Sequence, residues 1–166
     1  AVHEILDSSP THFLAELSQR VKQLGEQSGR YVHLVLEDAM NEAHHLSPQS
    51  NPTSRAQWND DWHHTAHVLA TGEREGYYAD FNADTAAQER TTLEYFCRAL
   101  TEGFAYQGEV SAYHESQPRG EETVGLPLTA FVNFIQNHDQ VGNRALGERL
   151  ERIARNETVV KMMAAA

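Results

Sequence analysis

The stretch AQWNDDWHHTAHVLATG, residues 56–72, contains the pattern that decides the fold class. It starts with a short apolar segment that ends at Trp58, and Asn59 or Asp60 then stands where a helix N-cap is preferred. Apolar residues continue at helical spacing as far as Gly72, a residue type that commonly ends helices. The stretch therefore predicts a strand followed directly by a helix, the repeating unit of parallel α/β proteins.

The sequence before this unit predicts a helix and then a strand. Residues 7–29, which include PTHFLAELSQRVKQLGEQSG, have Pro10 in the first turn and Gly25 as the expected stop. RYVHLVLED, residues 30–38, is too densely apolar for a half-exposed strand, so we expect a parallel strand covered on both faces. The expected buried stripe of the helix comprises Phe13, Leu17, Val21 and Leu24.

The sequence after the unit continues the alternation. Residues 76–103 predict an aromatic loop and a helix, residues 106–127 a turn-rich surface segment, residues 129–140 a strand, and residues 143–154 a helix. The helix within 76–103 is expected to bury Leu93, Phe96, Cys97 and Leu100. Strands and helices that alternate in this way predict a parallel sheet.

The expected architecture is a slice of a larger fold. A complete (β/α)₈ barrel needs about 250 residues, more than the 166 here. The chain opens AVHEIL without an initiator methionine and closes ETVVKMMAAA within an apolar, helix-favouring run. We therefore predict α/β structure in which residues 1–166 are a fragment of one catalytic (β/α)₈ TIM barrel domain, with its middle to late strands, truncated at both ends. A doubly wound open sheet is the structural alternative.

Charge and composition exclude several classes of protein. The net charge is −11 and no stretch concentrates Lys or Arg, which argues against a nucleic-acid partner. No apolar run reaches membrane-spanning length and no signal peptide is visible, so no membrane partner is expected. Cys97 is the single cysteine, a usage that suits a reducing cytoplasm.

Polar side chains follow each predicted strand. In parallel α/β folds the carboxyl ends of the strands form the ligand-binding edge, and every predicted strand places a carboxylate there. Carboxylates beside tryptophan, histidine and asparagine suit glycoside hydrolysis, while the many histidines also leave metal-assisted hydrolysis open. The residues at these strand ends are Glu37 and Asp38, then Trp58, Asn59, Asp60 and Asp61, then Asn137, His138 and Asp139.

Simpler interpretations of the same residues remain open. Glu37 can be the first solvated residue after a strand, and Asp60 or Asp61 can cap the helix that follows. His63 and His67 have the spacing of a zinc-binding helix, but position 64 is His where a metalloprotease has Glu. We therefore expect no metal, and interpret HHTAH as a polar helix start that lines a cleft. Tyr77 and Tyr78 are interpreted as packing residues, and Cys97 as a core residue.

Two segments carry a family resemblance. AQWNDDWHHTAHVLATGEREGYYADF and FIQNHDQVGNRALGERL resemble the malto-oligosyltrehalose trehalohydrolases, a family within the α-amylase superfamily of glycoside hydrolases. NHD alone indicates only the superfamily, whereas QWNDDWHH is far more specific. The resemblance extends over nearly the whole chain and is weakest in DAMNEAHHLSPQS, the loop after Glu37.

The resemblance implies a retaining glycosidase without a cofactor, which cleaves the α-1,4 bond next to the trehalose end of a malto-oligosaccharide-type substrate. It implies that Glu37 is the general acid/base and that Asp139 stabilises the transition state, with His138 beside it. Trp58, Asn59, Asp60 and His3 match cleft-lining, substrate-binding positions. The nucleophilic aspartate of the family would precede Ala1, so the fragment alone is expected to be inactive.

The resemblance also implies a functional pairing with malto-oligosyltrehalose synthase. A glycogen branching enzyme or another α-amylase-superfamily enzyme is the first alternative function. A non-catalytic carbohydrate-binding protein is the second, and such a protein would not need Glu37 and Asp139 on the same edge.

Overall fold

The computed structural model describes residues 7–47, 55–82 and 90–165. Three strands, β1 (Leu34–Leu36), β2 (Arg55–Trp58) and β5 (Phe131–Val132), pair in the order β1-β2-β5, and both pairings are parallel. Gln57 lies opposite Leu36 on one side and Phe131 on the other. The predicted α/β class with a parallel sheet is therefore confirmed.

The strand-helix unit over residues 56–72 forms as predicted. β2 leads through Asn59 into α2 (Asp60–Thr71), which ends at Gly72 in the left-handed conformation, with φ 74°. The Asn59 side-chain oxygen accepts a hydrogen bond from the backbone N–H of Trp62 at 3.2 Å. This side-chain oxygen satisfies one of the backbone donors that the first turn of a helix leaves free, which fixes where α2 begins.

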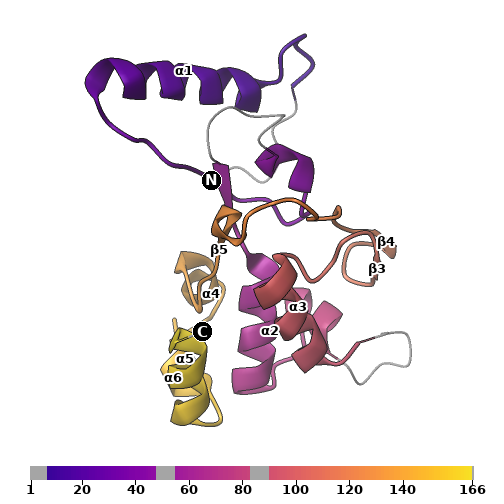
Figure 1. The fold of residues 1–166 in the computed structure, drawn as a ribbon. Coiled ribbons are helices and arrows are strands. Elements are labelled where there is room, and N and C mark those ends of the chain that lie inside the picture. The colour runs from indigo at the N-terminus through magenta and orange to yellow at the C-terminus, as the bar shows by residue number, and fades with distance from the viewer. Residues whose placement is uncertain (1–6, 48–54, 83–89, 166) are drawn as a thin grey trace.

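α3 (Thr92–Glu102) packs beside α2 (Figure 1). Its N-terminus is a capping box, in which Thr91 and Glu94 each accept from the other's backbone N–H. The helix buries Phe96 as predicted and leaves Leu100 partly buried, but Leu93 is 58% exposed and Cys97 is exposed. The prediction that Leu93 and Cys97 are core residues is wrong, because the buried face of α3 is turned toward Tyr95 and Ala99.

The main core lies between α2, α3 and the short 3₁₀ helix η2 (Gly76–Phe81), which forms the expected aromatic loop. Its rings are in direct contact: Tyr95 stacks on Tyr106 at 5.3 Å, and the Phe81 ring meets both edge-on. The core thus fixes the orientation of α2 under the sheet edge. Its fully buried members are Trp62, Ala66, Val68, Tyr78, Phe81, Tyr95, Phe96, Ala99, Ala105 and Tyr106.

α1 (Phe13–Ser28) begins after His12 and runs through Gly25 to Gly29, so the predicted stop at Gly25 is wrong. Gly25 has another role: the chain folds back over it, and a Cβ there would lie 2.6 Å from the carbonyl oxygen of Arg30. The expected stripe is not buried either. Phe13 is 48% and Leu24 is 59% exposed, because the described elements do not pack over this side of α1 (Figure 1).

β1 differs from its prediction in the same way. Val32 is 39% and Val35 is 46% exposed, so among the described residues β1 is not covered on both faces. Its side chains on the other face, Leu34 and Leu36, are half-buried. The dense apolar pattern correctly predicted a parallel strand. In the described part of the chain, however, β1 is an edge strand that pairs with β2 alone.

The segment 106–127 was predicted to lie at the surface, and it is only partly exposed. It forms an antiparallel hairpin from β3 (Val110–Ser111) and β4 (Gln117–Pro118). Tyr106, Ser111 and Arg119 are nevertheless buried, because their polar atoms bond to other parts of the chain.

The C-terminal third contains less regular structure than its pattern predicts. Only Phe131–Val132 pair as a strand within residues 129–140, since Leu128–Ala130 form a 3₁₀ turn, η3, after Pro127. The helices are α4 (His138–Gly142), α5 (Leu150–Ile153) and α6 (Glu157–Ala165), and the long helix predicted over 143–154 is reduced to α5. No described helix is long and apolar enough to cross a membrane.

Candidate functional site

Three carboxylates lie at the carboxyl edge of the parallel sheet. Glu37 directly follows β1, Asp60 follows β2 as the first residue of α2, and Asp139 comes after β5 in the first turn of α4. Because β2 lies between β1 and β5, Asp60 is the middle one of the three. The strands of Glu37 and Asp139 are therefore not adjacent, but their ends share one edge.

The electrostatics of Asp60 link the three groups. Burial, together with the negative charge of the adjacent Asp61, raises the pKa of Asp60 to about 7, and the charges of Glu37 and Asp139 add to the increase. Arg119 opposes the shift only in part. Asp60 is therefore near enough to both Glu37 and Asp139 to respond to their charges, and its strand lies between theirs in the sheet.

Glu37 lies at a half-buried position and its Oε2 atom is buried with no hydrogen-bond partner among the described residues. The backbone that follows it is held in place. Gln57, on β2, donates to the Asp38 carbonyl at 2.8 Å, and the Asp38 carboxylate accepts from the N–H groups of Met40 and Glu42. A buried polar atom without a partner on a fixed loop is a group available to a ligand.

Asp139 is part of a mixed aromatic and polar surface. His138 Nε2 lies 3.3 Å from the Asp139 carboxylate, and both side chains are largely accessible. The His138 ring stands edge-on to Trp58 at 6.2 Å, and Trp58 also contacts Phe134. The turn is fixed by Asn137, whose side chain accepts from the Asp139 N–H at 2.8 Å. Trp58, His138 and Asp139 are therefore brought together as one surface.

Asn59 does not contribute to this surface. Asn59 is fully buried, and its side-chain amide donates to the Gly103 carbonyl at 2.7 Å and to Asn133 at 3.0 Å while its oxygen caps α2. These bonds occupy its polar atoms, so Asn59 is a structural residue here. His3 lies outside the described residues.

Asp61 does not cap α2, and its role was missed at the level of sequence. It is fully buried, and one of its oxygens accepts from the Asn41 side chain at 2.8 Å and from two backbone N–H groups, those of Ala105 and Tyr106. Its other oxygen pairs with Arg119 Nη2 at 2.6 Å. Arg119 also donates to the Ala39 carbonyl, so this ion pair anchors the loop that follows Glu37. Sequence spacing contains no signal for a pair 58 residues apart.

His63 and His67 of HHTAH are packed in the interior and do not line a cleft as expected. His63 stacks on Phe134 at 4.9 Å, and burial lowers its pKa to about 3, helped by the neighbouring His67. His67 stacks on Tyr78 at 4.1 Å and its Nε2 lies 2.8 Å from Glu73. Both rings are therefore buried by packing, and Tyr78 is a core packing residue as predicted.

Comparisons with known proteins agree on one group of enzymes. No family model matches the sequence. A malto-oligosyltrehalose trehalohydrolase from Mycobacterium tuberculosis is 37% identical over 152 residues, 90% of this chain and 25% of that protein. One from Deinococcus radiodurans is 39% identical over 149 residues, 88% of this chain and 22% of that protein.

A crystal structure assigned as an alpha amylase from Salmonella typhimurium superposes on 99% of this chain and 27% of its own, with a TM-score of 0.84 and 44% identity. The chain thus spans about a quarter of the length of the curated relatives it matches. The resemblance inferred from the sequence is confirmed: along nearly its whole length, this chain is similar to one segment of malto-oligosyltrehalose trehalohydrolases.

Proposed function

We propose that this chain forms part of the catalytic (β/α)₈ barrel of a glycoside hydrolase that releases trehalose from malto-oligosyltrehalose. The observation that carries the proposal is the common edge of Glu37, Asp60 and Asp139, where the pKa of Asp60 responds to the other two carboxylates. The similarity to trehalohydrolases supports the choice of substrate. On this proposal residues 1–166 belong to a single catalytic domain, and further barrel strands come from sequence outside them.

In the proposed reaction Glu37 acts as the general acid and base. Protonated Glu37 donates its proton to the departing trehalose oxygen while a nucleophilic carboxylate, supplied by sequence before Ala1, attacks the anomeric carbon. The ionised Glu37 then takes a proton from water, which releases the sugar from the enzyme with retained configuration. The buried, unpartnered Oε2 of Glu37 supports this role, because it is free to bond to the glycosidic oxygen.

Asp139 and its neighbours would bind the sugar ring. The Asp139 carboxylate accepts hydrogen bonds from sugar hydroxyls, and these strengthen as positive charge develops on the ring in the transition state. His138 lies beside it and adds a polar contact, while Trp58 offers an aromatic face for the apolar side of a sugar. The half-buried Asp60 would also contact the substrate, because its strand, β2, lies between the strands that precede Glu37 and Asp139.

The substrate proposed here is the product class of malto-oligosyltrehalose synthase, so the two enzymes would act in sequence. The single cysteine, Cys97, fits a reducing cytoplasm as the compartment of both. A glycogen branching enzyme would transfer the glycosyl group to another chain and release no trehalose. A carbohydrate-binding protein would bind the oligosaccharide without turnover. The products formed from malto-oligosyltrehalose therefore separate the three functions.

The decisive variant is Glu37→Gln in the full-length protein, with Glu26→Gln, an exposed glutamate of α1, as the matched control. We expect Glu37→Gln to lower kcat by about 10²- to 10⁴-fold, the usual contribution of general acid–base catalysis, with little change in oligosaccharide affinity. On an aryl glycoside with a good leaving group, glycosylation should lose much less, because that group needs no proton. Near-normal trehalose release by Glu37→Gln would refute the assignment.

A further inference from the structure

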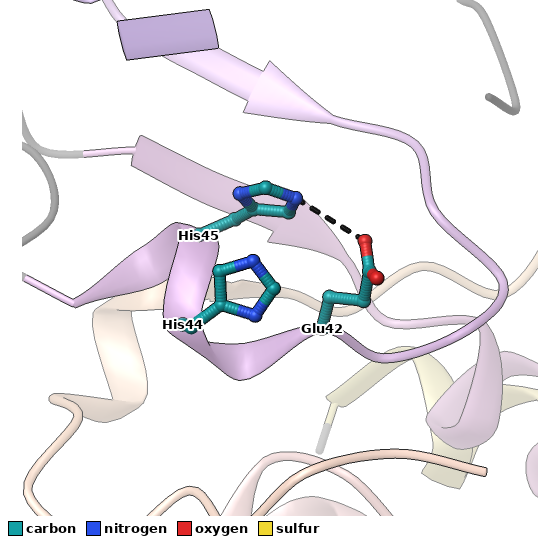
Figure 2. A group of neighbouring side chains, drawn as sticks. All are labelled: Glu42, His44 and His45. Carbon is teal, nitrogen blue, oxygen red and sulfur yellow. Dashed lines mark ion pairs between the residues drawn. The ribbon is translucent and has the colours of Figure 1, made fainter. Parts of the chain in front are cut away.

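A second cluster of ionisable side chains lies on the loop that follows β1. Glu42, His44 and His45 each offer one ligand atom, and these atoms lie within 4.8 Å of one another. Figure 2 shows the two imidazole rings and the carboxylate gathered around the 3₁₀ helix η1 (Ala43–Leu46). We call these three residues the His44 cluster.

The spacing within the His44 cluster is close to that of metal ligands. His45 Nε2 and a carboxylate oxygen of Glu42 are 3.2 Å apart, and the two imidazole rings are 4.0 Å apart between centroids. Two ligands bound tetrahedrally to zinc at about 2.0–2.1 Å are separated by roughly 3.4 Å. The Glu42–His45 pair therefore already has the spacing of a tetrahedral edge, and the ligand atom of His44 lies within 4.8 Å of both.

Glu121 orients the His44 ring from the opposite side. His44 Nδ1 lies 2.9 Å from both carboxylate oxygens of Glu121, and the backbone N–H of His44 donates to the same group at 2.8 Å. An imidazole whose Nδ1 donates to a carboxylate presents its Nε2 atom to a ligand, which is the usual arrangement around protein-bound zinc.

The backbone beneath the His44 cluster is fixed by buried contacts. Asn41 has a positive φ of 60° and is fully buried, and its side chain donates to Asp61 at 2.8 Å. The Glu42 N–H donates to Asp38 at 3.0 Å, whereas the Glu42 carboxylate makes no capping bond to η1 and lies beside His45 instead. The backbone that carries the cluster is therefore held in position before any ligand binds, which lowers the cost of binding.

We propose that the His44 cluster binds a divalent transition-metal ion of the zinc class, with Glu42, His44 and His45 as ligands, Glu121 as the residue that orients His44, and water in the remaining position. Imidazole nitrogen and carboxylate oxygen are ligands that zinc accepts in tetrahedral sites. A single divalent ion also balances the charge of both Glu42 and Glu121. His–Glu ion pairs alone account for the pairwise contacts, but exposed ion pairs stabilise little and do not require both rings to converge.

The metal ion would lie where two parts of the chain meet. His12, the N-cap residue of α1, has its ring 5.8 Å from that of His45, and its Nδ1 accepts from the Leu14 N–H. A bound ion would therefore hold the start of α1 near the loop that follows Glu37. This proposal does not depend on the glycosidase function, since it concerns binding alone.

The test is a titration of the full chain with Zn²⁺ by calorimetry, and with Co²⁺ as a spectroscopic probe. We expect one equivalent to bind, with visible absorption bands typical of four-coordinate Co²⁺. His44→Gln and His45→Gln should each weaken binding by at least about tenfold, and Glu121→Gln by about 10- to 100-fold. His33→Gln is the matched control, because His33 is an exposed histidine that directly precedes β1 and lies outside the cluster. It should bind the metal as the wild type does.

Three outcomes would overturn the proposal. One is an absence of saturable binding. Another is binding that needs millimolar metal and has the same affinity in Glu121→Gln as in the wild type. The third is wild-type affinity in the His44→Gln/His45→Gln double variant, which would mean that the metal binds elsewhere. Circular dichroism of each variant, recorded without metal, ensures that a loss of binding is not a loss of fold.

Discussion

The buried ring of His63 makes the stability of this protein sensitive to acid. His63 is fully buried, and burial, aided by the neighbouring His67, lowers its pKa to about 3, compared with about 6.5 for an unperturbed histidine. Between these two values the unfolded chain binds a proton that the folded chain does not. The stability that the neutral ring provides is therefore fully present above pH 6.5 and is lost as the pH falls toward 3.

The size of the effect follows from the two pKa values. Between pH 7 and pH 5 the protonation of His63 in the unfolded chain lowers the free energy of unfolding by about 2 kcal/mol. We expect His63→Phe to remove this loss, because phenylalanine keeps the stacking on Phe134 but does not titrate. Any change in packing that the larger ring causes is the same at both pH values and cancels.

The assay is urea denaturation of the wild type and of His63→Phe at pH 7 and pH 5. The wild type should lose about 2 kcal/mol more than the variant between these conditions. His33→Phe, a substitution at an exposed histidine, should lose as much as the wild type. Equal losses in wild type and His63→Phe would show that the buried ring is not the source of the acid sensitivity. If the phenylalanine variant does not fold, His63→Gln serves the same purpose.

Three further predictions concern groups that the structure holds in unusual environments. Arg119→Met leaves Asp61 buried without its counter-charge and should lower the free energy of unfolding by about 3–5 kcal/mol in urea titrations; a loss below 1 kcal/mol would contradict a tight buried pair. Gly120→Ala should destabilise far more than Gly125→Ala, since both have φ 86° but only the first would place a Cβ 2.0 Å from a carbonyl oxygen; equal melting temperatures would refute this. Between pH 4 and pH 8 the free energy of unfolding of the wild type should fall by roughly 2–4 kcal/mol more than that of Asp60→Asn, because the raised pKa of Asp60 makes the wild type lose stability as the pH rises. Parallel pH profiles of the two proteins would show that the pKa of Asp60 is ordinary.

Sequence reasoning succeeded where the determining interactions are local. Asn59 and Gly72 define both ends of α2, because a cap acts within one turn of its helix. It failed at Gly25, where the requirement for glycine comes from the return of the chain at Arg30 and not from the end of a helix. A glycine has the same appearance in a sequence in both situations.

The candidate site shows the same division. The carboxylates Glu37, Asp60 and Asp139 were expected from strand ends, and the strand order places them on one edge. The Asp61–Arg119 pair was not expected, because it joins residues that only the complete fold brings together. Cys97 and Leu93 were misplaced for a related reason: an apolar pattern gives the period of a helix, but the neighbouring elements decide which face is buried.

The partners of Asp61 also have a consequence for synthesis of the chain. Asn41 precedes it, whereas Ala105, Tyr106 and Arg119 follow it by 44, 45 and 58 residues. A nascent polypeptide that has left the ribosome only as far as α2 contains this carboxylate but none of the later donors. The hydrated, ionised side chain then opposes burial, so we expect the segment after Glu37 to reach its final geometry only after residue 119 has emerged.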